Sequence, residues 1–193
     1  MKRQLLKAIY PLTMWVSRLK KKELVAVNKQ MVAPLQSIYD LLVEFNTGQA
    51  VLLQQFAGKK LLLVNTASDC GYTAQYAELQ RLHEMFNDEL VVIGFPANDF
   101  NEQEKGNDAE IAQFCTVNYG VSFPLAKKSV VVKNAMQHPV FKWLSYKNQN
   151  GWNDQPPSWN FTKYLVNEKG VLTHYFEPAV SPLSDSVTKA IRQ

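Results

Sequence analysis

The sequence predicts an α/β fold in which a central mixed sheet is flanked by helices. Two short apolar segments, residues 61–64 and 90–95, have the length and composition of buried strands, and a segment with helical character follows each. Nearer the C-terminus, residues 161–166 and 171–176 flank the turn Asn167-Glu168-Lys169-Gly170, which predicts a hairpin. Strands that alternate with helices in this way indicate a layered α/β domain.

The other elements are predicted by turn and capping signals. A first hairpin is expected from residues 37–45 and 49–53. Three helices are expected after it, at residues 74–86, 107–118 and 138–146. Asn107 and Glu110 form a capping box for one helix, and Pro139 suits the first turn of the next. Residues 125–133 are expected to be extended, and a last helix begins near Ser184. This order is that of the thioredoxin-like fold with an added N-terminal β-hairpin.

Composition and charge divide the chain into two parts. A chain of 193 residues with 46% hydrophobic content predicts one globular domain and a small addition. Residues 1–34 carry a net charge of +7, whereas residues 35–193 carry −3, so the pI near 9 does not predict a nucleic-acid-binding domain. We therefore expect a basic N-terminal extension over 1–34 and a thioredoxin-like domain over 35–193, with no nucleic-acid partner.

The extension has two short apolar faces, which contain Leu5, Leu6 and Ile9, then Leu12, Trp15, Val16 and Leu19. No apolar run approaches the ~20 residues of a membrane span. One interpretation is an interfacial amphipathic helix that brings residues 1–30 to an anionic membrane surface. The others are a helix packed across the domain, a frayed terminus, or an atypical export signal. A cytoplasmic location, with or without membrane association, is the expected one.

Cys70 is the most informative residue, because it follows an apolar strand and precedes a predicted helix. The N–H groups at a helix N-terminus favour thiolate over thiol. Cys70-Gly71-Tyr72-Thr73 has the form of a redox C-x-x-C turn with threonine in place of the second cysteine. We expect the Thr73 hydroxyl to donate a hydrogen bond to the thiolate, and peroxide to be the electrophile. The alternative is a buried, inert cysteine.

Three neutral hydrogen-bond donors are predicted at the ends of other strands. Gln103 lies in the loop after residues 90–95, and Trp159-Asn160 precedes the strand that begins at Phe161. Loops at the carboxyl ends of strands carry the ligand sites of open α/β sheets. An indole and two amides could stabilise a thiolate without an ion pair. Each of the three taken singly could equally be a solvated, core or turn residue.

These segments resemble the three motifs of the glutathione peroxidase family, in order: residues 65–73, residues 94–104 and Trp159-Asn160-Phe161. The resemblance covers the chain from Ser37 to the last helix. It implies the thioredoxin-like fold and a catalytic tetrad of Cys70, Gln103, Trp159 and Asn160, with Cys70 as the peroxidatic residue. The sequence departs from the family pattern around the pocket rim, at Asp99, Asn101-Glu102 and Lys105.

The reaction that the resemblance implies is reduction of hydrogen peroxide or an organic hydroperoxide. The Cys70 thiolate would become a sulfenic acid, which a second thiol must resolve. Cys115 is the other cysteine of the chain, and some family members that thioredoxin reduces carry their resolving cysteine at the matching place. Cys115 could instead face the core with Ile111 and Phe114. Both interpretations of Cys115 hold if the helix unwinds so that its sulfur can reach that of Cys70.

We expect thioredoxin rather than glutathione as reductant, because a Cys70–Cys115 disulfide is what a dithiol attacks. Glutathione is an anion, whereas the flanking residues are mainly acidic. The short connection Asn118-Tyr119-Gly120-Val121 lacks the longer insertion by which tetrameric animal relatives associate, so the resemblance implies a monomer. The alternative function is a redox relay that passes oxidation to a partner protein. His83, His138 and His174 have no ligand spacing, so neither a metal nor another cofactor is expected.

Overall fold

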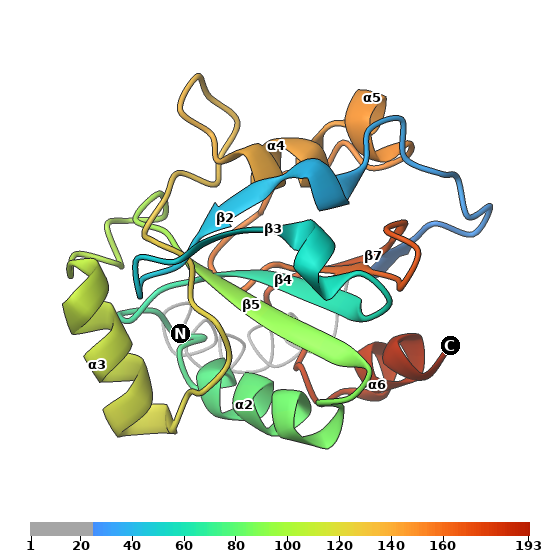
Figure 1. Cartoon of the computed structure of the whole chain (residues 1–193). Coiled ribbons are helices and arrows are strands. Elements are labelled where there is room, and N and C mark those ends of the chain that lie inside the picture. Colours follow the sequence, from blue (N-terminus) through green and yellow to red (C-terminus); the bar gives the residue numbers. More distant parts are fainter. Residues whose placement is uncertain (1–24) are drawn as a thin grey trace, which may run out of the picture.

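The computed structural model of the chain describes residues 25–193 and has the expected α/β architecture (Figure 1). Its central sheet has the strand order β1-β7-β6-β4-β5. The strands are β1 Val25–Val27, β4 Lys60–Thr66, β5 Leu90–Pro96, β6 Lys163–Val166 and β7 Leu172–Phe176. The sheet is mixed, because β4 and β5 pair in parallel and the other neighbours are antiparallel.

The alternation of side chains along β4 creates two cores. Leu62 and Val64 pack on the face covered by α2 (Gln75–Met85) and α6 (Asp185–Arg192), where α3 (Asp108–Tyr119) also contributes. Leu61 and Leu63 pack on the opposite face, under α4 (Pro139–Ser145) (Figure 1). The side chains of these three leucines and of Val64 are fully buried. Burial of each one stabilises the folded state by about 1.5–3 kcal/mol. β4 is therefore a rigid support for the loop that carries Cys70.

The helix predictions are confirmed with small shifts of their ends. The capping box of α3 forms as expected, because Asn107 accepts from the backbone of Glu110 while the Glu110 carboxylate accepts from the backbone N–H of Asn107. His138 caps α4 through its ring nitrogen, which accepts from Val140 N–H at 3.2 Å. A further short helix, α5 (Lys147–Asn150), follows α4.

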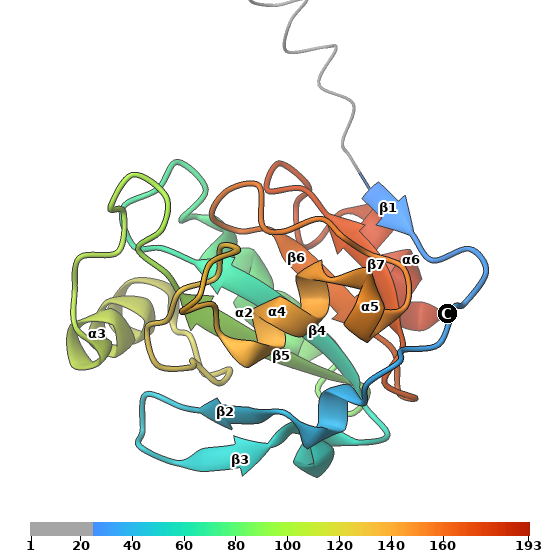
Figure 2. The same cartoon turned by 90° about the horizontal axis from the view of Figure 1, so that it is seen from above.

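The first hairpin is shorter than predicted and lies outside the central sheet (Figure 2). Only β2 (Leu42–Glu44) and β3 (Ala50–Leu52) pair. The residues before β2 form the 3₁₀ turn η1 (Ile38–Asp40), and those after β3 form η2 (Leu53–Phe56). The Ser37 side chain caps η1 by accepting from Tyr39 N–H, and this local hydrogen bond competes with strand pairing.

Residues 125–133 are also not a strand. They make isolated bridges, such as Gly94 with Leu125 and Phe45 with Ala126, and otherwise run irregularly. The loop is held at intervals rather than along a ladder. Asp99, for example, accepts from Val131 N–H at 2.7 Å through its carboxylate.

β1 is a strand that the sequence analysis did not predict. It pairs with β7 at the edge of the sheet and lies within residues 1–34, the expected extension. Residues 25–34 thus include part of the central sheet, whereas the two apolar faces predicted further upstream lie outside the described residues. Among residues 25–193, no helix combines the length and apolar character needed to cross a bilayer.

The segment after β1 docks against α5 through backbone contacts. Leu35 and Gln36 both donate their N–H groups to Gln149 O, at 2.8 and 3.1 Å. Gly151 ends α5 with φ +96°, and a Cβ there would lie 2.4 Å from Ala33 O. The close approach of these two backbones therefore requires glycine.

We predict that Gly151→Ala lowers the free energy of unfolding by about 2–4 kcal/mol, because it adds a backbone clash to the strain of a left-handed alanine. Gly48→Ala is the matched control. Gly48 also has positive φ (+85°), but its Cβ would meet nothing within 4 Å, so only the strain of about 1 kcal/mol applies. Denaturant unfolding of both variants tests this, and equal losses would show that residues 33–36 do not pack as described.

Candidate active site

Asn65, at the end of β4, holds the Trp159-Asn160 segment against the sheet. Its side chain donates to Trp159 O at 3.0 Å and accepts from Thr162 N–H at 3.1 Å. Its backbone carbonyl accepts from Phe161 N–H at 2.6 Å. Asn65 is fully buried, so these hydrogen bonds replace those that water would make. The loop before β6 is thereby fixed beside the loop after β4.

Cys70 lies in the turn between β4 and α2, and its side chain is partly exposed. The Tyr72 N–H donates to Cys70 Sγ at 3.4 Å, and Thr73 N–H donates to Cys70 O at 3.0 Å. The backbone thus wraps around the sulfur just before the first turn of α2. Cys70 is therefore not the buried residue that the alternative interpretation expected, and its reactivity stays a prediction.

Thr73 does not have the role predicted for it. Its hydroxyl donates to Ala67 O at 3.0 Å and accepts from Cys70 N–H at 3.0 Å, so its one proton is not directed at the thiolate. Thr73 instead fixes the turn. Gly71, the residue after Cys70, has open space where a side chain would be.

Gln103 is joined both to the Cys70 loop and to Asn160. Its backbone carbonyl accepts from Asp69 N–H at 3.0 Å, and its side-chain Oε1 accepts from Asn160 Nδ2 at 2.8 Å. The side-chain NH₂ of Gln103 is therefore left to donate elsewhere. Asn160 is fully buried, and its Oδ1 has no donor among the described residues. An orphaned acceptor at such a place suits the O–H group of a reactant.

Trp159 packs its ring against Phe100, with centroids 5.4 Å apart. Its carbonyl accepts from Thr162 Oγ1 at 2.9 Å as well as from Asn65. Its indole N–H has no acceptor within residues 25–193. No hydrogen bond joins Sγ of Cys70 to Gln103, Trp159 or Asn160 in this part of the chain, so the structure gathers the loops of the predicted tetrad without closing all four side chains on one another.

Backbone strain is concentrated around this site. Phe161 has φ +65°, although it is a fully buried aromatic residue, and Asn101 and Glu102 have φ +51° and +53°. A non-glycine residue in the left-handed region persists only where its surroundings hold it. Asn101 and Glu102 are two of the positions at which the sequence departs from the glutathione peroxidase pattern, in which small residues are usual.

Cys115 lies on the buried face of α3 and is 0% exposed. Burial raises the pKa of its thiol to about 11, although the Tyr76 hydroxyl acts in the opposite direction by hydrogen bonding. Cys70 packs against the same apolar cluster that contains Cys115 and Tyr76. In this packed state, the Cys115 thiol is protonated and shielded from solvent.

Glu104 is a residue that the sequence analysis missed. Its side chain is only 1% exposed, and its carboxylate accepts from Ser68 Oγ at 3.1 Å. Its backbone N–H donates to Asn98 Oδ1 at 2.9 Å. Burial raises the pKa of Glu104 to about 7, although the Ser68 hydrogen bonds and the Lys128 charge act in the opposite direction. The sequence signal, a glutamate next to Gln103, does not reveal this burial.

Lys163, at the start of β6, is also fully buried. Its ammonium group donates to Gln75 Oε1 at 2.7 Å, to Val180 O at 2.6 Å and to Pro178 O at 3.2 Å. These contacts fasten the first turn of α2 to the loop after β7. The Lys163 charge is consequently inaccessible to an anionic ligand.

A cavity of about 320 Å³ opens beside Gln103, between the Cys70 loop and α3. Its apolar wall is formed by Ile111 and Phe114 of α3. Its other lining includes one lysine and four carboxylates, which are Lys105, Asp69, Glu102, Glu104 and Glu110. These carboxylates are not placed to hold a metal ion together, and neither is any other group of three or more His, Cys, Asp or Glu side chains within the described residues.

We predict that Glu104→Gln flattens the pH dependence of stability. The folded-state pKa of about 7 lies above the usual 4.5, so this group favours the folded state most at low pH and loses that contribution as pH rises to about 7. Above pH 7, the free energy of unfolding of the variant should therefore exceed that of the wild type by up to about 3 kcal/mol. Urea unfolding at pH 5.5 and 8 measures this, with the exposed Glu102→Gln as control. Parallel pH profiles for wild type and Glu104→Gln would contradict the burial of an ionisable carboxyl.

Comparison with known proteins connects this geometry to a family. Residues 38–145 match the family model described as glutathione peroxidase. The chain is 42% identical to the glutathione peroxidase homolog BsaA of Bacillus subtilis over 161 residues, which cover 81% of this chain and 99% of that protein. It is 38% identical to the glutathione peroxidase-like peroxiredoxin HYR1 of Saccharomyces cerevisiae over 162 residues, with 82% and 99% covered.

Solved structures show the same fold. The crystal structure described as Trgpx in apo form superposes with a TM-score of 0.61 at 32% identity, covering 82% of this chain and 97% of that one. A DsbF homologue from Corynebacterium diphtheriae superposes with a TM-score of 0.59 at 18% identity, covering 90% of this chain and 92% of that one. At this low identity, the similarity shows the thioredoxin-like fold alone. The chain belongs to the glutathione peroxidase family and is a peroxidase with a thioredoxin-like fold.

Proposed function

We propose that Cys70 is the peroxidatic residue of this peroxidase. Its thiolate attacks one oxygen of the peroxide, the O–O bond breaks, and the second oxygen leaves as water or an alcohol after it takes a proton. Cys70 becomes a sulfenic acid. The observation that carries this proposal is the partly exposed Cys70 Sγ, which accepts from Tyr72 N–H beside the loop of Gln103.

The other tetrad residues then have distinct roles. Asn160 holds Gln103 Oε1, which leaves the Gln103 NH₂ to donate to the thiolate or to the peroxide oxygen. The orphaned Asn160 Oδ1 is suited to accept the O–H of a bound hydroperoxide. The indole N–H of Trp159 is a third neutral donor. Donors that are already oriented stabilise the charge that develops during O–O cleavage.

We propose that Cys115 resolves the sulfenic acid. Its thiolate attacks Cys70 Sγ, the S–O bond breaks, hydroxide leaves and is protonated to water, and a disulfide forms. The buried Cys115 requires α3 to open first. Only Ile111 and Cys115 of the 12 residues of α3 are buried, so little apolar burial opposes such opening.

Thioredoxin is the proposed reductant, because a dithiol can attack the resulting disulfide. The acidic cavity beside Gln103 and the inaccessible Lys163 support this choice over glutathione, whose carboxylates require exposed cations. The yeast relative that is named a peroxiredoxin is consistent with it. α3 ends at Gly120, which adopts the left-handed conformation (φ +63°), and the connection after it is short. A short connection lacks the longer insertion by which tetrameric relatives associate, and this supports a monomer.

We predict that Cys115→Ser reduces one equivalent of peroxide at the wild-type rate but loses at least about 90% of thioredoxin-driven turnover. The reason is that the sulfenic acid of Cys70 forms without a thiol to resolve it. Stopped-flow kinetics measure the first step, and mass spectrometry after oxidation should detect no intramolecular disulfide.

Cys70→Ser is the control for this experiment and should abolish both steps, because a serine hydroxyl is scarcely ionised near neutral pH. If Cys115→Ser turns over normally with thioredoxin, Cys115 is only a core residue. Peroxide consumption by Cys70→Ser would remove Cys70 from the mechanism.

A further inference from the structure

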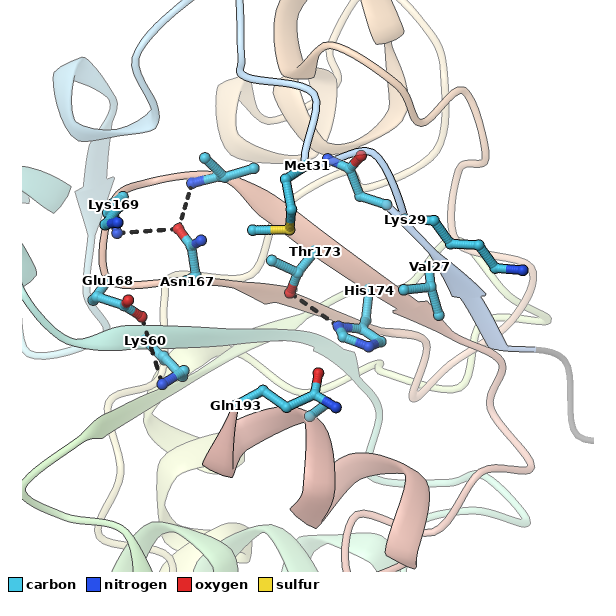
Figure 3. A pocket seen from close by; sticks show the side chains of 13 residues that line it. Val27, Lys29, Met31, Lys60, Asn167, Glu168, Lys169, Thr173, His174 and Gln193 are labelled. Carbon is cyan, nitrogen blue, oxygen red and sulfur yellow. Dashed lines mark hydrogen bonds and ion pairs between the residues drawn. The ribbon is translucent and has the colours of Figure 1, made fainter.

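Figure 3 shows a second pocket, of about 610 Å³. It lies at the opposite end of β4 from the Cys70 loop. Lys60, the first residue of β4, lines it, whereas the Cys70 loop follows Thr66 at the other end of the strand. A strand of seven residues places these two ends about 20 Å apart. The peroxidase reaction makes no use of this pocket.

Asn167 presents a fixed donor to the pocket. Its Oδ1 accepts from Lys169 N–H at 3.0 Å and from Val171 N–H at 2.9 Å, which sets the orientation of the amide. The NH₂ group on the other side has no acceptor among residues 25–193, although the side chain is only 8% exposed. Figure 3 shows the Asn167 amide at the pocket wall, near Met31.

His174 presents a fixed acceptor. Thr173 Oγ1 donates to Leu165 O at 3.1 Å, so the His174 Nδ1 that lies 3.0 Å from this oxygen must carry a hydrogen and donate. Burial lowers the pKa of His174, so the ring is neutral at pH 7. Its Nε2 is then left as a lone-pair acceptor on a ring that stacks parallel to Phe176.

The charge at the pocket is positive. Three lysines line it, and one of them, Lys60, lies 3.5 Å from the Glu168 carboxylate. Lys29 and Lys169 are exposed and make no ion pair in the described part of the chain. A phosphate group at the mouth would therefore meet the Lys169 ammonium group and the Asn167 NH₂, which lie at the same edge of the pocket, whereas Lys29 adds positive charge at the opposite edge (Figure 3).

Exposed apolar side chains occur along the segment that contributes to the pocket wall, and two of them, Val27 and Met31, line the pocket. Val27, Met31, Val32 and Leu35 are 40%, 52%, 37% and 74% exposed and lie within nine residues of one another in the chain. Met31 has φ +49°, and its side chain projects over the pocket in Figure 3. This segment directly continues residues 1–24, which contain seven lysines and arginines and one acid. Apolar side chains beside cations are typical of surfaces that bind anionic membranes.

We propose that this pocket binds the headgroup of an anionic, hydroxyl-bearing phospholipid and that residues 27–35 form the surrounding membrane-contact face. The headgroup phosphate lies beside Lys169 and the Asn167 NH₂, a headgroup hydroxyl donates to His174 Nε2, and Lys29 at the opposite edge of the pocket contacts the anionic surface around the headgroup. The apolar side chains of residues 27–35 enter the interface around it. This inference does not depend on the peroxidase mechanism or on the role of Cys115.

The test uses the full chain and co-sedimentation with phosphatidylcholine vesicles that contain or lack phosphatidylglycerol, at low salt. We expect binding to the anionic vesicles, and a loss of about thirtyfold in the double variant Lys29→Ala/Lys169→Ala, since each lysine near such a surface contributes about fivefold. Met31→Ser and His174→Phe should each weaken binding severalfold. Peroxide reduction in solution should be unchanged in all of them, which also reports that they are folded.

Two exposed residues elsewhere supply matched controls, and Lys142→Ala and Met136→Ser should bind as the wild type does. If the double lysine variant binds as tightly as these controls, residues 1–24 alone account for membrane binding and the proposal is wrong. Soluble glycerol phosphate separates a lipid from a free anion. Saturable binding of glycerol phosphate without vesicle binding would also overturn the proposal, because the pocket would then serve a soluble phosphate.

Discussion

The buried side chain of Asn65 is the constraint on which the candidate active site depends. Its amide bridges the end of β4 to the carbonyl of Trp159 and the N–H of Thr162, two segments nearly one hundred residues apart in the chain. Replacing it with an apolar residue would leave the Thr162 N–H unpaired, at a cost of about 1–3 kcal/mol, and would remove one of the two donors to Trp159 O. The left-handed conformation of Phe161 exists because this clamp holds it. The positions of Trp159 and Asn160 relative to Cys70 are thus set by β4.

Two buried ionisable groups extend this scaffold. Lys163 fastens α2 to the loop after β7 through three oxygen acceptors, and α2 begins directly after the Cys70 turn. Glu104 is held by Ser68, which lies in the same turn. The Glu104 charge also acts on Cys115 and raises its pKa, a smaller effect than that of burial. The ionisation of Glu104 and that of Cys115 are therefore linked.

Much of the fold was predictable because its signals are local. The capping box of Asn107 and Glu110, Pro139 in a first turn and the Asn167–Gly170 turn each specify a boundary within four residues. β1 could not be predicted, since three residues at a sheet edge carry almost no pattern. The 3₁₀ turn at Ile38–Asp40 depends on one Ser37 hydrogen bond that competes with a strand. For the site, motif matching predicted Cys70, Gln103, Trp159 and Asn160, and the structure brings Gln103 and Asn160 into contact. It could not predict that Ala67 O takes the Thr73 proton or that Glu104 is buried, because both depend on tertiary contacts.

The two ends of the central sheet differ in charge, and this difference has a physical consequence for orientation. The cavity beside Gln103 is lined by four carboxylates and one lysine, whereas the pocket at the start of β4 has three lysines and one carboxylate. Near an anionic surface, the first is repelled and the second attracted. Docking through residues 27–35 would then leave the acidic end facing water. There it would be open to dissolved peroxide and to the proposed protein reductant, and α3 would have room for the proposed unwinding. A molecule held by its active-site end would meet neither condition. The proposed membrane contact and the proposed thioredoxin-driven turnover are therefore compatible in the orientation that the charge distribution favours.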